Sequence, residues 1–534
     1  MAPRKLKFWG WGYEDGLAPQ VQKQVESVMA HRFGVNEWKK TPPPTIGEIQ
    51  LNPSRLSIPH TLQHLCSTDP FERLSHTYGK SYRDVVRAFR RDYKNAPDIV
   101  AFPHTEEDLL NLLDWCNSMN AAAIIYGGGT SVVGGVEAAI GDQYSGAVTI
   151  DLRNFNKVLE VDGISRAARI QAGIRGPVME RQLKDHGLSL RFFPQSFEFS
   201  TLGGWIATRA GGHFATLNTH IDDLVESLRV ITPKGVVETR RLPGSGAGPS
   251  PDRLFIGSEG TLGIITEAWV RLQDRPIYRT SASVRFPDFQ SGVLAVKKLS
   301  QSGLYPSNCR LLDAGEAQDS GAGEGHSAVL MLGFESHDHL LDIWMIRALE
   351  CCKEYGGTYS PDNIKTSQNS TRSREGAVET WRNAFIQAPY LRDAMVGLGV
   401  IVETFETAIT WNRFEEFHKG VMEAAQNAVK EISGLNGWVT CRITHVYPDG
   451  PAPYYTVKAL GRNGGELEQW DEIKAAVSET IIRLGGTITH HHAVGRDHRP
   501  WYDQQRPPLF ASALQSVKRT LDPNYILNPG VLID

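Results

Sequence analysis

The sequence predicts an α+β protein made of two unlike blocks, and three observations support this prediction. Residues 97–276 alternate short apolar strands with helices in a βαβ-like order and carry three stretches rich in Gly, Ser and Thr. The block after residue 276 alternates strands with helices and contains a Pro-Asp-Gly turn between two strands, which indicates an antiparallel sheet. The chain has 534 residues, more than one ordinary domain requires.

Four parts follow one another along the chain. Residues 1–93 combine helical periods with a proline-rich loop. Residues 94–276 hold the βαβ-like block, in which Thr105 is placed to cap the first helix. Residues 277–485 form the antiparallel block, and residues 486–534 are turn-rich and carry the run "THHHAVG" from Thr489 onward.

The composition is typical of a globular enzyme, with 41% hydrophobic and 22% charged residues. Because 56 Lys and Arg residues face 60 Asp and Glu residues, the net charge is −4 and no surface for nucleic acid is expected. Six cysteines without C-x-x-C spacing indicate the reduced thiols of an intracellular protein. No secretory signal, membrane-spanning run or S-K-L-type address is visible, so we expect a cytoplasmic protein.

The N-terminal stretch "RKLKFWGWGY" leaves two alternatives open. Its bases and aromatic residues suit a segment that lies on a membrane surface, which would make the protein peripherally membrane-associated. Alternatively, Trp9 and Trp11 pack against the body of the protein, and we favour this second interpretation.

The stretch "IIYGGGTSVVGG" predicts a buried strand that runs into a glycine loop. It matches neither familiar phosphate motif, since Val132 breaks G-x-G-x-x-G and Gly135 stands where a P-loop needs lysine. Consecutive glycines still present bare N–H groups that suit a pyrophosphate, and Thr130 and Ser131 add hydroxyl donors. The alternative is a simple tight turn. Two further stretches, residues 194–212 and 256–268, repeat this composition, and three such loops suit an extended dinucleotide.

In combination, "GGGTS", "FSTLGGWIATRAGG" and "GSEGTLGIITEA" resemble the flavin-binding domain of vanillyl-alcohol-oxidase-type flavoproteins. Within that superfamily the chain is most similar to the alkylglycerone-phosphate synthase family. The segments "WGWGYED", "PDIVAFP", "CRLLD", "VETFETAITW", "CRITHVYPDGPAPYY" and "THHHAVG" follow in that family's order across nearly all 534 residues.

The resemblance implies a fold and a cofactor. Residues 94–276 would be a VAO-type (PCMH-type) FAD-binding domain, residues 277–485 a substrate (cap) domain, and residues 486–534 would complete the flavin site. FAD would bind without a covalent link, because the first loop offers no His or Cys and His213 is an unconvincing alternative. Carried over from the family, the FAD contacts are Ile125, Tyr126, Gly127, Gly128, Gly129, Thr130, Ser131, Gln195, Ser196, Phe197, Glu198, Phe199, Ser200, Thr201, Thr208, Arg209, Ala210, Gly211, Glu259, Gly260, Thr261, Leu262, Gly263, Ile264 and Ile265.

The resemblance also implies a reaction. The acyl chain of acyl-dihydroxyacetone phosphate would be exchanged for a fatty alcohol through a flavin N5 adduct, without net redox change, in ether-lipid synthesis. Tyr454 matches the family's catalytic tyrosine, Arg392 its substrate-binding arginine, and Arg310 a second required arginine. Each of these residues could instead have a purely structural role. Tyr454 could simply pack within its strand, and the adjacent Tyr455 serves as the control for this. The two arginines could simply form ion pairs. We expect Arg392 and nearby histidines to lower the pKa of Tyr454.

His490, His491 and His492 match the family's essential triple histidine, and His498 follows. On an extended backbone His490 and His492 would point to one side and His491 to the other, so we expect acid–base groups and no metal. A polar surface loop is the structural alternative. His491 or His492 is our best candidate for the key ring.

A flavin oxidase or dehydrogenase of a small 2-hydroxy acid or alcohol is the functional alternative, and a flavin protein without catalysis is a third. Such dehydrogenases resemble this chain and bind a metal through an "H-x-G-D-G-N-x-H" stretch. Here His445 is present in "HVYPDGPAPYY", but tyrosine stands in place of the second histidine, which favours the synthase. As partners we expect a lipid-like substrate and a second copy of the chain in a homodimer.

Overall fold

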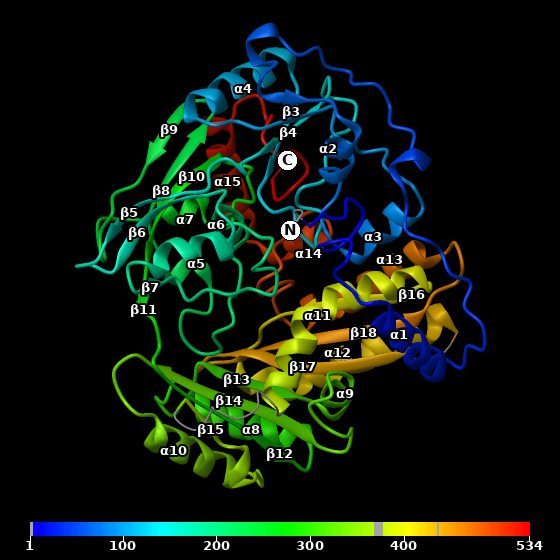
Figure 1. Cartoon of the computed structure of the whole chain (residues 1–534), viewed down its shortest axis with the longest axis vertical. Coiled ribbons are helices and arrows are strands. Elements are labelled where there is room, and N and C mark those ends of the chain that lie inside the picture. The colour runs from blue at the N-terminus through cyan, green and yellow to red at the C-terminus, as the bar shows by residue number, and fades with distance from the viewer. Residues whose placement is uncertain (1–3, 368–376, 435–436, 534) are drawn as a thin grey trace.

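The computed structural model describes residues 4–367, 377–434 and 437–533. Two parts lie one above the other in Figure 1: an upper part with three sheets, and a lower part built on one large sheet. The α+β prediction is confirmed by this arrangement.

The upper part begins with a four-stranded sheet in the order β1 (Cys66–Ser67), β2 (Ile99–Ala101), β4 (Ala147–Asp151), β3 (Ala122–Tyr126). Strands β2, β4 and β3 run parallel. The connection from β2 to β3 is α4 (Glu106–Met119), where Thr105 accepts a hydrogen bond from the backbone N–H of Asp108, as its predicted cap.

The second sheet of this part has the order β5 (Val158–Asp162), β6 (Ala167–Gln171), β10 (Ile264–Arg271), β8 (Val225–Thr232), β9 (Gly235–Glu238). All its pairs are antiparallel, so the βαβ-like order expected through this region is wrong here. Tight turns join β5 to β6 and β8 to β9, and such short connections permit only antiparallel neighbours. A small ladder pairs β7 (Leu188–Ser189) with β11 (Gln273–Asp274).

Six further helices belong to the first 255 residues: α1 (Pro19–Phe33), α2 (Pro70–Ser75), α3 (Tyr82–Phe89), α5 (Gly176–Lys184), α6 (Leu202–Thr208) and α7 (Asp252–Phe255). Trp9 and Trp11 of the N-terminal segment pack against the body, as favoured from the sequence: Trp9 meets Phe89 edge-on, and Trp11 is buried against Phe199.

The lower part is built on an antiparallel sheet, as predicted, and the structure gives this sheet seven strands. Its order is β15 (Lys365–Thr366), β12 (Tyr278–Phe286), β14 (Ala328–Ser336), β13 (Asn308–Leu312), β17 (Trp438–Val446), β18 (Pro451–Leu460), β16 (Val400–Glu406). The Pro-Asp-Gly turn joins β17 to β18. The helices of this part are α8 (Phe289–Ser300), α9 (Ala314–Asp319), α10 (Asp342–Lys353), α11 (Ala377–Gly397), α12 (Trp411–Ser433) and α13 (Glu466–Arg483).

Side chains of α8, α10, α12 and α13 join one face of this sheet in a single apolar core, for example Val296, Met345, Phe417 and Ile473. The other face carries polar side chains and is turned toward the upper part (Figure 1). This division of the two faces places the site described below.

The chain ends by returning to the upper part through α14 (Arg499–Gln505) and α15 (Pro508–Leu521) (Figure 1). Ala123 of β3 donates its N–H to the carbonyl of Ile526 and accepts the N–H of Asn528, so the tail forms an extra bridge on that strand. Among the described residues, no helix is long and apolar enough to cross a membrane.

Candidate active site

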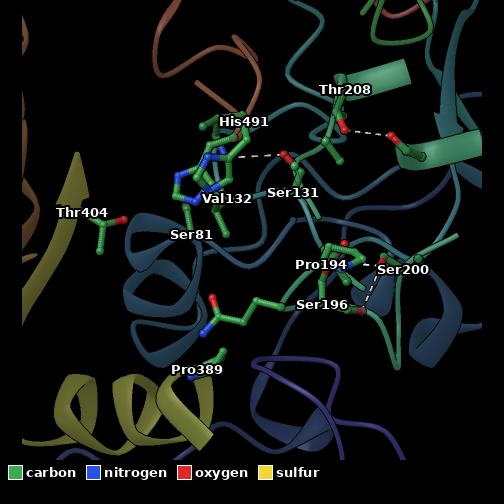
Figure 2. Close-up of a pocket in the computed structure, with 18 of the residues that line it drawn as sticks. Ser81, Ser131, Val132, Pro194, Ser196, Ser200, Thr208, Pro389, Thr404 and His491 are labelled. Atoms are coloured by element: carbon green, nitrogen blue, oxygen red, sulfur yellow. Dashed lines mark hydrogen bonds between the residues drawn. The ribbon is translucent and has the colours of Figure 1, made fainter. Parts of the chain in front are cut away.

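A cavity of about 440 Å³ lies between the two parts. Its upper wall consists of the glycine-rich loops, and its lower wall consists of the polar face of β16, β17 and β18 together with α11. Figure 2 shows Ser131 and Thr208 on the upper side, and Thr404 and Pro389 across the cavity from them. Trp11 of the N-terminal segment adds to the lining.

The upper wall fits the pyrophosphate of FAD. Gly128, Gly129 and Thr130 line the cavity, and their backbone N–H groups donate no hydrogen bond within the described residues. Gly129 has φ +64°, and a Cβ at Gly128 would collide with the backbone oxygen of Phe199, so both positions require glycine. A run of unused N–H groups next to a cavity is the arrangement that holds phosphate oxygens.

Most of the FAD contacts carried over from the family line this cavity, and eight do not. Tyr126, for instance, points to the far side of β3, where its hydroxyl bonds to Ser75, and Arg209 pairs with Asp222 instead. Tyr126 is an exception because successive side chains of a strand point to opposite faces, and Arg209 is an exception because it pairs with a neighbouring carboxylate. The eight residues outside the lining are Tyr126, Phe197, Glu198, Phe199, Arg209, Thr261, Leu262 and Ile264. His213 also lies outside it, held between Phe193 and Phe214.

Tyr454 lies in the lower wall because of the register of three strands. On β18 it pairs with Glu406 of β16 on one side and Arg442 of β17 on the other, so the three side chains form a row on the cavity face. Tyr455 pairs with Phe405 and Cys441 and is fully buried on the opposite face. The sheet therefore separates the two adjacent tyrosines.

Burial raises the pKa of Tyr454 above its ordinary value, and Arg442 opposes this rise. We expected nearby cations to bring the pKa of Tyr454 below its ordinary value. Without bound ligands this expectation is wrong, because the effect of burial is larger than that of Arg442. The guanidinium over the Tyr454 ring, 3.8 Å from its centroid, belongs to Arg442, which also pairs with Glu316 at 2.5 Å. Arg392 lines the cavity from α11, 3.4 Å from Asp393.

Arg310 is buried in the cavity wall and pairs with no carboxylate among the described residues. Its Nη2 donates to the carbonyl of His213, its Nε has no partner, and its guanidinium lies over the rings of Trp381 and Phe385. Burial lowers its pKa to about 10, which leaves the charge in place at neutral pH. A buried cation without a counter-ion marks a site for an anion.

The sequence suggested that the three histidines alternate along an extended strand. They do not, because residues 490–492 form a bend. His491 and His492 line the cavity, with ring centroids 6.1 Å and 5.6 Å from that of Tyr454. His490 turns away from the cavity toward Tyr447, 2.7 Å from its hydroxyl. Burial holds the pKa of His491 well below 6.5 and lowers that of His492 to about 3, so both rings are neutral.

Two buried carboxylates, one from each part, hold the backbone of this histidine loop. Glu406 accepts hydrogen bonds from the backbone N–H groups of His490, His491 and His492 at 2.5–3.0 Å and from the hydroxyl of Thr489. Glu259, expected as an FAD contact, lines the cavity and directs its carboxylate to the N–H groups of Val494 and Gly495. Burial raises the pKa of each carboxyl to about 7.

His445, His490 and His491 bring ring nitrogens within 4.8 Å of one another and could hold a metal ion. A bulge in β17 between Ile443 and His445 turns Thr444 and His445 together into the cavity wall. The sequence pointed to His445 through its likeness to the dehydrogenase stretch, but it did not bring His445 together with His490 and His491. It also missed Arg442, although the "CRITHV" stretch carries it.

Family comparisons agree with this geometry. Residues 97–240 match the family described as "FAD binding domain", and residues 275–532 match "FAD linked oxidases, C-terminal domain". A Dictyostelium discoideum protein named alkyldihydroxyacetonephosphate synthase is 33% identical over 481 residues, which cover 87% of this chain and 78% of that protein.

A solved structure described as alkyldihydroxyacetonephosphate synthase aligns with a TM-score of 0.79 and 27% identity over 98% of both chains. A Saccharomyces cerevisiae D-lactate dehydrogenase is also similar, at 34% identity over 439 residues, or 81% of this chain and 72% of that protein.

Proposed function

Because this chain belongs to the alkyldihydroxyacetonephosphate synthase family of FAD-dependent enzymes, we propose that it exchanges the acyl chain of acyl-dihydroxyacetone phosphate for a fatty alcohol without net redox change. The observation that carries this proposal is the position of Tyr454. It faces two neutral imidazoles, His491 and His492, across from the glycine loops, in one cavity.

The glycine loop and residues such as Gln195, Ser200 and Thr208 would hold FAD. When bound, FAD supplies the ring chemistry that lets the exchange proceed without net oxidation. We also propose the division into parts 1–93, 94–276, 277–485 and 486–534, with the last part closing the flavin side of the cavity.

Tyr454 moves the proton at the reacting carbon, in this proposal. Its phenol lies between the Arg442 guanidinium and the Glu406 carboxylate. The positive charge of Arg442 favours the phenolate form of Tyr454, as long as the negative charge of the substrate does not cancel this effect. His491 and His492 take the proton of the incoming alcohol and stabilise the departing carboxylate.

Arg310 and Arg392 hold the anionic end of the substrate. Arg310 has the stronger case, because it is buried without a carboxylate partner among the described residues, whereas Arg392 stands beside Asp393. The aromatic rings around Arg310, on Trp381 and Phe385, lie on α11 and offer apolar surface to the lipid chain.

The test is an exchange assay under anaerobic conditions. Purified protein is mixed with a long-chain acyl-dihydroxyacetone phosphate and an isotope-labelled fatty alcohol, while the flavin spectrum is followed. We expect labelled ether product without lasting bleaching of the flavin. No labelled ether product under these conditions would refute the proposal.

A second candidate is a flavin dehydrogenase of a small 2-hydroxy acid. The cluster of His445, His490 and His491 favours it, since such enzymes use metal-bound carboxylates, and so does the similarity to D-lactate dehydrogenase. Full bleaching by a hydroxy acid such as D-lactate in the same assay would support this candidate.

We propose a peripheral membrane contact through the outer face of α10, not through the N-terminal segment. Ile343 and Ile346 lie three residues apart on α10 and are 75% and 58% exposed, and Leu340, two residues before the helix, is 53% exposed. Liposome flotation should decrease in an Ile343→Ser/Ile346→Ser double variant. Light scattering of the same variant measures its mass in solution and so tests the expected homodimer. If the variant is still a dimer, the dimer interface lies on a face other than that of α10.

A further inference from the structure

A chain of hydrogen bonds lies behind the histidine loop, on the side away from the cavity. The Nε2 of His220 is 2.8 Å from the carbonyl oxygen of His490. The hydroxyl of Tyr447 lies 2.7 Å from Nε2 of His490 and 3.1 Å from the Thr219 hydroxyl, which is 3.3 Å from Nδ1 of His220. Finally, Nδ1 of His490 lies 3.0 Å from Nδ1 of His491.

The two ends of this chain determine where its protons lie. A carbonyl oxygen only accepts, so Nε2 of His220 carries a hydrogen, and with one proton on the ring its Nδ1 accepts from a hydroxyl. The Thr219 hydroxyl can therefore donate to Nδ1 of His220, and the Tyr447 hydroxyl can donate to the Thr219 oxygen and not to His490. Its oxygen then accepts a hydrogen from Nε2 of His490, and Nδ1 of His490 is left as an acceptor.

At the other end, Glu406 decides the direction. All of its hydrogen-bond partners are donors, namely three backbone N–H groups and the Thr489 hydroxyl, which is the pattern of an accepting carboxylate. Its Oε2 stands 3.3 Å from Nδ1 of His491. A lone pair at that nitrogen would face two acceptors, Glu406 and His490, whereas a hydrogen there satisfies both.

We infer that Glu406, Tyr447 and His220 are positioning residues that fix His491 in the Nδ1–H tautomer and leave its Nε2 as the proton acceptor of the cavity. The role of His491 as a proton acceptor rests on the proposed function, whereas the tautomer assignment rests on the hydrogen bonds alone. The His491 ring lines the cavity, and its Nε2 contacts no donor or acceptor among the described residues. His492 has no such chain behind it and stands 3.7 Å from Glu406.

The assignment gives His491 a defined part in the exchange. Nε2 takes the hydroxyl proton of the incoming alcohol as the alcohol oxygen bonds to the substrate carbon, and the Glu406 carboxylate stabilises the imidazolium through Nδ1–H. Over one turnover the acyl group leaves as a fatty acid, which carries away this proton. The ring then returns to its neutral state, and no oxidant or reductant is consumed.

Neutron crystallography of the FAD-loaded protein in D₂O tests the assignment without any assay of activity. We expect deuterium on Nδ1 of His491, Nε2 of His490 and Nε2 of His220. The reverse pattern, with deuterium on Nε2 of His491 and Nδ1 of His490, would overturn the inference. A metal ion bound between His445, His490 and His491 would overturn it as well.

Kinetics of variants give a second, independent readout. Glu406→Gln and Tyr447→Phe should each lower kcat by roughly 10–100-fold, while the KM for both substrates stays within about threefold and FAD is retained. Tyr455→Phe, another buried tyrosine outside this chain of bonds, is the matched control and should leave kcat unchanged. An unaltered kcat in Tyr447→Phe would contradict the inference, even where Glu406→Gln fails to fold.

Discussion

At the scale of single residues, the site depends on which face of a strand a side chain occupies. Tyr454 and Tyr455 are neighbours in the chain and have similar chemistry, yet only Tyr454 reaches the cavity. Tyr455 instead packs on α12, where its hydroxyl lies 3.2 Å from Nδ1 of His418. This pair therefore offers an internal control.

Tyr454→Phe should lower kcat by roughly 10²–10⁴-fold, because it removes an acid–base group while the ring continues to fill its place. The flavin absorbance and the melting temperature should stay close to those of the unmodified protein. Steady-state kinetics of Tyr454→Phe and Tyr455→Phe, measured side by side, check this. Equal losses in both variants would mean that packing, and not proton transfer, explains the effect.

Arg310→Met should raise the KM for the phosphorylated substrate by roughly 10–100-fold, because a charge-assisted hydrogen bond to an anion is lost. Arg310→Lys should have a smaller effect, since it retains the charge. Arg285→Met, an exposed arginine of the same sheet, is the control. A normal KM with a lowered kcat in Arg310→Met would remove Arg310 from substrate binding.

At the scale of elements, α12 buries a titratable ring within an aromatic stack. His418 stacks on Phe414 and on Tyr455, and burial lowers its pKa to about 4. In the unfolded chain this ring has a pKa near 6.5. Acid therefore favours unfolding between these two values, because the unfolded chain takes up a proton that the folded helix does not.

His418→Gln should reduce this acid sensitivity. Between pH 7 and pH 5 the native protein should lose about 2 kcal/mol more free energy of unfolding than the variant. Urea unfolding of both proteins at the two pH values measures the difference. Parallel losses in the two proteins would show that His418 is accessible to protons in the folded state.

The elements were largely predictable from the sequence, because their signals are local. Thr105 precedes an apolar-periodic run and caps α4, and the Pro-Asp-Gly turn joins β17 to β18. The bulge at Ile443 to His445 was not predictable, since it depends on how β17 meets β18. For the same reason the sequence indicated Tyr454 and the histidines, but not the pairing of Arg442 with Glu316 or of Glu406 with the loop backbone.

At the scale of the whole molecule, the N-terminal segment ties the two parts together. Trp11 donates its backbone N–H to the buried carboxylate of Asp393 on α11 at 2.6 Å, and Lys7 approaches the same carboxylate at 3.4 Å. The Trp11 ring packs on Phe199 of the upper part. The segment thus bridges α11 and the flavin loops.

Deletion of residues 1–12 should lower the melting temperature by roughly 5 °C and reduce turnover, because Asp393 and Phe199 lose these partners. Liposome flotation should not change, since Trp9 and Trp11 pack inward. Calorimetry and flotation of the deletion variant test both statements. Normal stability with lost flotation would restore the membrane alternative for this segment.

The protein should be yellow as purified and should release FAD on acid precipitation. The cavity presents glycine N–H groups to the cofactor, and His213 lies outside its lining. Absorbance of the supernatant at the flavin maximum, compared with that of the pellet, provides the measurement. Flavin that remains in the denatured pellet would indicate a covalent link.

The bridge between β3 and the chain's tail has a consequence for biosynthesis. The side chain of Asn528 donates to the carbonyl of Gly135, 393 residues earlier, and to that of Glu259, while the tail pairs with Ala123 beside the first glycine loop. On the ribosome, the loops that receive the nucleotide emerge long before the residues that brace them. We therefore expect FAD to bind only after the tail has been synthesised, and a chain arrested on the ribosome before Ile526 should carry no flavin.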